Sequence, residues 1–244
     1  MMMKTRLKQV AILIACFLVS VTSIFAEDQK PAAAYPDPAK FESAIEKYEA
    51  ADAQQMPPTG AIVALGSSTV RLWSEEIGDD LAPLTIIPRG FGGSNMNDAL
   101  FFVERIAIRY KPRAILLYEG DNDLAQGISP ELILETFLKL VAKVQEHLPE
   151  TRIYVLSIKP SVARRQLWPE AQRANQMLAA ECDKDDRLIF LDVATPMLDT
   201  KCEIRTDLFI KDNLHMNRTG YELWRDTIKP LLHERELKFE QLAE

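Results

Sequence analysis

The chain has 244 residues, of which 47% are hydrophobic and 27% charged, and its formal net charge is −7. This length and composition suit one domain with a substantial hydrophobic core. The acidic balance argues against nucleic acid as a partner, because the phosphate backbone binds basic surfaces.

The first 26 residues have the pattern of a secretory signal peptide. Lys4, Arg6 and Lys8 form a basic segment, and an apolar stretch follows up to Ala26. That stretch is shorter than the ~20 residues needed to cross a bilayer. We therefore expect cleavage near Ala26 and export to the periplasm or the medium. Cleavage removes three positive charges and no negative ones, which changes the formal charge from −7 to −10.

A second interpretation of this segment concerns Cys16. Residues 13–16 have the form of a lipoprotein processing site, which would leave a lipid on Cys16. The apolar stretch continues well past Cys16, so we prefer the signal peptide. Residues 27–244 then form a single domain.

The rest of the chain alternates between helical and strand patterns. Residues 39–52 are expected to form an amphipathic helix laid against the domain, because apolar side chains recur there at helical spacing. Five short apolar segments predict strands at 61–65, 85–87, 114–118, 153–157 and 188–191. Helical patterns cover 97–109, 130–147 with Ser129 as N-cap, 169–181 and 219–232. This alternation predicts a parallel sheet with helices on both faces.

Sites in such sheets form at the carboxyl ends of the strands. Strand one is followed by Gly66, Ser67 and Ser68, where a hydroxyl nucleophile would sit at the start of a helix. The alternative is that one serine merely caps that helix, which is the usual role of an isolated Gly-Ser-Ser.

The next two strand ends are also polar or glycine-rich. Strand two is followed by three glycines within residues 90–93, which either present backbone amides to a ligand or form a plain turn. After strand three, Asn122 could donate its side-chain amide into a site. The neighbouring carboxylates of Glu119, Asp121 and Asp123 either cap the loop or bind a metal. We prefer capping, because adjacent positions on an extended chain point to opposite sides.

Asp212 and His215 precede the last predicted helix. Positions i and i+3 of a tight turn are near neighbours, so Asp212 can accept a hydrogen bond from His215 Nδ1 and leave Nε2 facing outward as a base. The other two histidines, His147 and His233, lie on predicted helices and have no Asp three residues before them.

Taken in order, these four segments resemble the SGNH hydrolases, also called the GDSL family: Gly66-Ser67-Ser68, Phe91-Gly92-Gly93, residues 120–123 and residues 212–215. The resemblance implies a three-layer α/β/α sandwich of flavodoxin-like form with strand order 2-1-3-4-5. It implies Ser68 as nucleophile, His215 as base and Asp212 as its partner, with an oxyanion hole formed by Ser68, Gly93 and Asn122. Ser67 replaces the Asp that gives the family its name, as in its lysophospholipase-like and acetylesterase-like branch.

The predicted function is carboxylic ester hydrolysis through an acyl-enzyme, with no metal or organic cofactor. The absence of a long lid-like insertion favours small acyl groups on a glycan or other small ester over a lysophospholipid or thioester. Two other classes stay open. A metal-dependent phosphoesterase would use Asp121, Asp123, Asp212 and His215 as ligands, and a binding module would keep the fold without turnover.

Several further residues have open or structural interpretations. Cys182 and Cys202 form either a disulfide or two separate thiols, since spacing alone cannot show whether their Cβ atoms meet. Trp73 is expected to pack into the core. Arg71, Arg89 and Lys159 are expected to pair with surface acids. The sequence does not indicate an oligomeric state.

Overall fold

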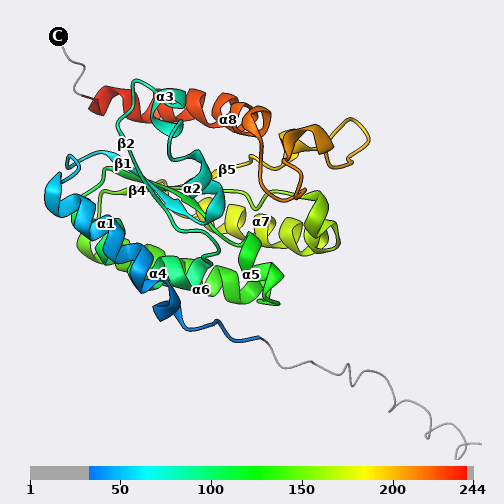
Figure 1. Cartoon of the computed structure of the whole chain (residues 1–244), viewed down its shortest axis with the longest axis horizontal. Helices are drawn as coiled ribbons and strands as arrows, with labels where there is room; N and C mark the ends of the chain where they lie inside the picture. The colour runs from blue at the N-terminus through cyan, green and yellow to red at the C-terminus, as the bar shows by residue number, and fades with distance from the viewer. Residues whose placement is uncertain (1–32, 241–244) are drawn as a thin grey trace, which may run out of the picture. The chain divides into compact units, whose positions relative to one another are not determined.

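The computed structural model describes residues 33–240, so the predicted signal peptide and Cys16 lie outside the described residues. Five strands form one parallel sheet: β1 (Ile62–Gly66), β2 (Ile86–Gly90), β3 (Ala114–Tyr118), β4 (Arg152–Leu156) and β5 (Leu188–Leu191). Their order is β2-β1-β3-β4-β5, which confirms the predicted order 2-1-3-4-5. Helices lie on both sides of the sheet in a three-layer arrangement (Figure 1).

The helices complete the chain between and around the strands. The α-helices are α1 (Glu42–Gln54), α2 (Ser68–Trp73), α3 (Ile77–Asp80), α4 (Met96–Ile106), α5 (Asp121–Ala125), α6 (Pro130–His147), α7 (Trp168–Cys182) and α8 (Arg218–Glu236). Short 3₁₀ turns are η1 (Pro38–Phe41), η2 (Ile108–Tyr110), η3 (Val162–Leu167), η4 (Thr195–Met197), η5 (Thr206–Leu208) and η6 (Leu237–Phe239).

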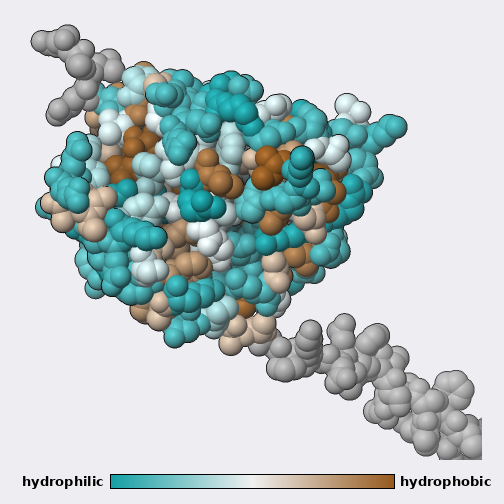
Figure 2. Space-filling view, in the orientation of Figure 1, coloured by the Kyte–Doolittle hydropathy of each residue, from teal (hydrophilic) through white to brown (hydrophobic). Residues whose placement is uncertain are grey.

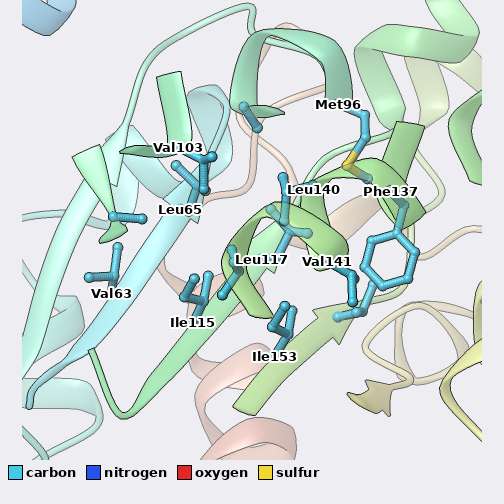
Figure 3. Close-up of a cluster of buried hydrophobic side chains, with 14 of the residues drawn as sticks. Val63, Leu65, Met96, Val103, Ile115, Leu117, Phe137, Leu140, Val141 and Ile153 are labelled. Carbon is cyan, nitrogen blue, oxygen red and sulfur yellow. The ribbon is translucent and has the colours of Figure 1, made fainter. Parts of the chain in front are cut away.

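Two hydrophobic cores fill the spaces on either side of the sheet. Successive strand residues point to opposite faces, so Val63 and Leu65 belong to one core, while Ile62 and Ala64 belong to the other. The first core packs against α1, α4, α6 and α7, and part of it is shown in Figure 3. The second core packs against α2, α3 and α8, with Trp224 fully buried. Burial on both faces explains why the strands are apolar throughout.

The N-caps of α6 and α4 follow from local sequence. Ser129 accepts a hydrogen bond from the Leu132 amide at the start of α6, and Pro130 occupies the first turn, where no amide is needed. The bounds 130–147 are therefore confirmed. Asn95 and Asp98 form a reciprocal capping box that starts α4 at Met96.

The N-terminal segment confirms the predicted helix against the domain, with shifted bounds. A 3₁₀ turn precedes α1, which runs to Gln54 rather than to residue 52. Ile45 is fully buried, and the Tyr48 hydroxyl donates to the carbonyl oxygen of Gly90 at 2.6 Å. The Asp52 carboxylate pairs with the Arg89 guanidinium at 2.5 Å. Arg89 is thus buried in an ion pair rather than placed on the surface.

Several element ends differ from the sequence prediction, and α4 for example ends at Ile106 instead of residue 109. Strand β2 continues through Pro88 to Gly90 instead of ending at residue 87. It lies at the edge of the sheet and pairs only with β1, so the missing proline amide costs no ladder bond. Helix α8 continues to Glu236 instead of residue 232, because the buried Glu236 carboxylate accepts hydrogen bonds from Arg152 at 2.5 Å and from the Tyr154 hydroxyl at 2.5 Å.

Both cysteines of residues 33–240 are free thiols, and Cys182 is buried while Cys202 is exposed. Burial raises the pKa of Cys182 to about 12. In the chain without residues 1–26, we expect a thiol reagent at pH 8 to modify Cys202 rapidly and Cys182 only after unfolding. Cys202→Ser should abolish the rapid reaction. Failure of either thiol to react in denaturant without a reductant would instead establish a disulfide.

Figure 2 shows polar groups over most of one face, with apolar groups in separate patches. Across residues 33–240, none of the helices combines the length and the apolar character that a bilayer crossing requires.

Candidate active site

Ser68 lies where β1 passes directly into α2. Ser67 precedes the helix in extended conformation (φ −83°, ψ −150°), and its side chain makes no capping hydrogen bond. Ser68 Oγ lies 3.0 Å from His215 Nε2. The alternative that a serine only caps the helix is therefore wrong for Ser68. Its hydroxyl is paired with the imidazole of His215, 147 residues away along the chain.

His215 is placed by a tight turn that Asp212 stabilises. The amide of Ile210 donates to the carbonyl oxygen of His215 at 2.9 Å, and Asn213 adopts the left-handed conformation with φ 58°, which asparagine tolerates. Asp212 Oδ1 accepts hydrogen bonds from the amides of Leu214 and His215, both at 2.9 Å. Its other oxygen, Oδ2, lies 2.6 Å from His215 Nδ1. One carboxylate thus holds both the turn and the imidazole ring.

The charge of Asp212 fixes the tautomer of His215. Partial burial raises the pKa of Asp212, but the hydrogen bonds from the His215 ring and from the two backbone amides outweigh it and lower this pKa to about 2. An ionised carboxylate accepts a proton from Nδ1–H, so Nε2 of the neutral ring carries the lone pair. That lone pair faces Ser68 Oγ, which is the geometry of an activated hydroxyl.

Gly93 lies in the turn after β2, as the sequence predicted. It adopts φ 91°, a conformation that favours glycine, and it is exposed. Gly90 is needed for a different reason, since a Cβ at that position would lie 2.2 Å from the backbone nitrogen of Arg71. The end of β2 and helix α2 therefore pack backbone against backbone. Within residues 33–240, the amides of Ser68 and Gly93 donate to no acceptor, so both are available to a ligand.

Asn122 lies in the first turn of α5, directly after β3. Its Nδ2 donates one hydrogen to the carbonyl oxygen of Ser94 at 2.9 Å, which links the turn after β3 to the turn after β2. A primary amide has two N–H groups, so one remains. Gly120, two residues before Asn122, adopts φ 112°.

The carboxylates around Asn122 are occupied by protein contacts. Asp123 is buried and accepts hydrogen bonds from the Met96 and Gly120 amides, both at 3.0 Å, which confirms loop capping. Asp121 pairs with Arg164 at 2.8 Å and with Lys159 at 3.5 Å. In the described part of the chain, no three His, Cys, Asp or Glu side chains are grouped as metal ligands. Asp121 and Asp123 thus both take part in contacts that hold the segments around Asn122.

Glu119 directly follows the last residue of β3 and is buried. Its Oε1 accepts a hydrogen bond from Ser94 Oγ at 2.6 Å, while Oε2 has no partner among residues 33–240. Burial raises the pKa of Glu119 well above its usual range, and the neighbouring Asp123 carboxylate adds to the rise. We therefore expect Glu119 to be protonated where an exposed glutamate is ionised.

Glu119→Gln should make the melting temperature less sensitive to a rise in pH from 5 to 8. Because folding raises the pKa of Glu119, its contribution to stability is complete below the unfolded-state value of ~4.3 and is lost as pH rises toward the folded-state value. Between pH 5 and 8, the melting temperature of the wild type should therefore fall relative to the variant, by roughly 5 °C. Glu75→Gln, at an exposed position, is the charge-matched control. Parallel curves for wild type and Glu119→Gln would contradict protonation.

The structure brings two further side chains to the site that the sequence did not assign to it. Lys159 is 3% exposed, and its Nζ donates to the carbonyl oxygen of Leu214 at 2.9 Å. It therefore supports the turn of His215 rather than pairing on the surface. Burial lowers the pKa of Lys159, and the neighbouring Asp121 carboxylate partly offsets this. Arg164 donates to Asn122 Oδ1 at 3.0 Å. The sequence did contain one indication of this. Both residues follow β4, whose carboxyl end lies at the same edge of the sheet as the other site residues.

The other residues weighed from the sequence lie outside the triad contacts. Trp73 is 1% exposed, and its Nε1 donates to Asp80 at 2.6 Å, as expected for a core residue. Arg71 forms no ion pair within the described part of the chain, contrary to expectation. Its side chain lies against Gly92.

Comparison with known proteins places these features in one family. Residues 57–223 match the model of the GDSL-like Lipase/Acylhydrolase family. The segment contains the four sequence blocks that meet in the structure. No curated protein matches the chain.

Solved structures share the fold. A protein from Streptococcus pneumonia is 21% identical, with a TM-score of 0.69 over 80% of this chain and 93% of its own. A GDSL-like lipase from Bacteroides thetaiotaomicron is 17% identical, with a TM-score of 0.65 over 78% of this chain and 97% of its own. The lipase/acylhydrolase from Enterococcus faecalis is 18% identical, with a TM-score of 0.59 over 72% and 97%. Because the family model covers more than half of the sequence, the chain belongs to the GDSL-like lipase/acylhydrolase family and is a serine ester hydrolase.

Proposed function

We propose that Ser68, His215 and Asp212 act as a catalytic triad that hydrolyses carboxylic esters through an acyl-enzyme. The observation that carries this proposal is the continuous chain of contacts: Ser68 Oγ to His215 Nε2 at 3.0 Å and His215 Nδ1 to Asp212 Oδ2 at 2.6 Å. These distances are within the range for proton transfer between a nucleophile and its base.

The reaction has two stages. His215 Nε2 takes the Ser68 proton as Oγ attacks the ester carbonyl, and the same proton then passes to the departing alkoxide, which leaves as the alcohol. Water enters, His215 takes one of its protons, and the hydroxide oxygen attacks the acyl-serine. The carboxylic acid is released as the proton returns to Ser68 Oγ. Asp212 stabilises the imidazolium in both stages without taking the proton.

The oxyanion of each tetrahedral intermediate would be bound by the Ser68 amide, the Gly93 amide and the second N–H of Asn122 Nδ2. The two backbone amides have no other acceptor among residues 33–240. Donors that are already oriented need no reorganisation as charge develops, and removing one typically costs about 10²- to 10³-fold in kcat.

The substrate we propose is a small acyl ester, such as an acetyl group on a glycan. Ser68 and His215 are partly exposed, and Gly92, Gly93 and Asn213 beside them are exposed. This exposure supports a small acyl group on an accessible alcohol. It provides less burial for a long acyl chain, whose affinity depends on apolar contact.

An ester panel tests this preference. We expect kcat/KM for p-nitrophenyl acetate to exceed that for the octanoate and palmitate esters by at least about tenfold, because long chains gain little burial. Acetylated oligosaccharides should release acetate, whereas lysophosphatidylcholine and acyl thioesters should be poorer substrates. The reverse order would identify a lysophospholipase or thioesterase on the same triad. Loss of activity in a chelator with no fluorophosphonate labelling would support the metal-dependent class.

We also propose export, on the basis of the basic and apolar pattern of residues 1–26. N-terminal sequencing of the protein recovered from a bacterial periplasm or medium should begin near Glu27. Retention in the membrane with a lipid on Cys16 would favour the lipoprotein interpretation.

A further inference from the structure

Arg164, in η3 after β4, contacts both the side chain and the backbone of the turn that carries Asn122. One guanidinium nitrogen donates to Asn122 Oδ1 at 3.0 Å. The second terminal nitrogen, Nη1, donates to the carbonyl oxygen of Asp121 at 3.1 Å. The same nitrogen pairs with the Asp121 carboxylate at 2.8 Å. The planar guanidinium makes such multiple contacts with fixed geometry. This side chain is 20% exposed, so the contacts are largely shielded from solvent.

These contacts determine which way the Asn122 amide faces. A carboxamide can turn by 180° and exchange its oxygen for its nitrogen. Arginine has donors and no acceptor, so only Oδ1 can face Arg164. Nδ2 then lies on the opposite side, with one hydrogen on the Ser94 carbonyl oxygen at 2.9 Å. The second hydrogen of Nδ2 has no acceptor among residues 33–240, so it can serve an oxyanion.

The guanidinium also increases the donor strength of that amide. A cation hydrogen-bonded to the carbonyl oxygen of an amide polarises it, so its N–H groups carry more positive charge. Removal of Arg164 would therefore weaken Asn122 as a donor and would also free it to turn.

The backbone beside Arg164 is bonded to the turn that carries the base. The Ala163 amide donates to the carbonyl oxygen of Asn213 at 3.0 Å, and Lys159 connects Leu214 with Asp121. The segment after β4 thus holds the oxyanion side and the base side of the site in one network.

We infer that Arg164 is a positioning residue that orients and polarises Asn122 for oxyanion binding. This inference rests on the proposed function, because it needs Asn122 to be an oxyanion donor. Arg164 does not touch the substrate, so its loss should lower kcat and leave KM nearly unchanged.

A double-mutant cycle with p-nitrophenyl acetate tests the inference. We expect Arg164→Ala to lower kcat about tenfold or more and Asn122→Ala about 10²- to 10³-fold. The double variant should match Asn122→Ala within about twofold, because without Asn122 there is nothing for Arg164 to orient. Arg165→Ala is the matched control. The Arg165 side chain is exposed and pairs with Glu203 at 3.0 Å, so wild-type kcat is expected.

The outcomes separate the inference from the proposed function. If Arg164→Ala costs the same factor with and without Asn122, or costs nothing, Arg164 acts independently of Asn122 and the inference is wrong. If Asn122→Ala keeps wild-type kcat, the proposed oxyanion hole is wrong and the inference is lost with it. Should Arg164→Ala fail to fold, Arg164→Lys replaces it in the cycle. It retains the charge but cannot make both contacts, so a smaller loss of kcat that again disappears beside Asn122→Ala is expected.

Discussion

Ser68→Ala is expected to lower kcat for ester hydrolysis by about 10⁶-fold and to abolish labelling by a fluorophosphonate. In the described part of the chain, the Ser68 hydroxyl is the hydrogen-bond partner of His215 Nε2. Without it, His215 has no nucleophile to activate, and only the oxyanion donors and substrate binding would remain. Initial rates with p-nitrophenyl acetate and gel fluorescence of the labelled protein measure the two effects.

The neighbouring hydroxyl provides a matched control for this variant. Ser67 is 3% exposed and its side chain does not cap α2. Ser67→Ala removes the same atom one position earlier, so it should be labelled normally and retain kcat within about tenfold. Wild-type rates for Ser68→Ala, or loss of labelling in Ser67→Ala, would contradict the assignment.

Asp212→Asn is expected to lower kcat by about 10⁴-fold with little change in the fold. An asparagine at this position can keep its oxygen on the amides of Leu214 and His215. Its NH₂ group then faces His215 Nδ1, which must accept rather than donate. The proton moves to Nε2, so the imidazole can no longer accept the proton of Ser68. The single-turnover rate of acetyl transfer measures this loss directly.

Asp212 itself is expected to stay ionised over the pH range of an esterase assay. The pKa of Asp212 is lowered to about 2, so its orienting charge is present above its ordinary value of 3.8 and is lost only as pH falls through about 2. A fall of activity near pH 4 caused by Asp212 would therefore contradict this pKa.

Asp199→Asn is the control for Asp212→Asn. Asp199 also uses one carboxylate oxygen to accept backbone hydrogen bonds in a turn, from Lys201 at 2.8 Å and Glu203 at 2.9 Å. It has no histidine beside it, so kcat should remain at the wild-type value. Equal losses in both variants would mean that the turn geometry, rather than the tautomer of His215, accounts for the effect.

The sequence predicted the features that depend on local spacing. The Asp212–His215 pair follows from a turn of four residues, and the α6 cap follows from Ser129 and Pro130. The strand segments were recognisable because burial on both faces leaves an uninterrupted apolar run. The glycines after β2 and Asn122 after β3 could be placed at the site because parallel strands end at one edge.

The features that escaped prediction depend on contacts between distant segments. The end of β2 beyond Pro88 depends on its edge position, and the end of α8 depends on Glu236 reaching Arg152. Arg164 lies eight residues beyond the end of β4, within a segment without regular spacing, so only the folded chain shows that it reaches Asn122. The burial of Lys159 and Glu119 likewise depends on packing that an isolated charged residue does not reveal.

Peptide mapping by mass spectrometry after fluorophosphonate treatment tests the central claim most directly. We expect one phosphonyl adduct per chain, located by fragmentation on Ser68 rather than Ser67, with loss of esterase activity in proportion to labelling. The adduct should be absent from Ser68→Ala and form far more slowly in Asp212→Asn. An adduct on another residue, or full esterase activity in protein labelled completely at Ser68, would contradict the account.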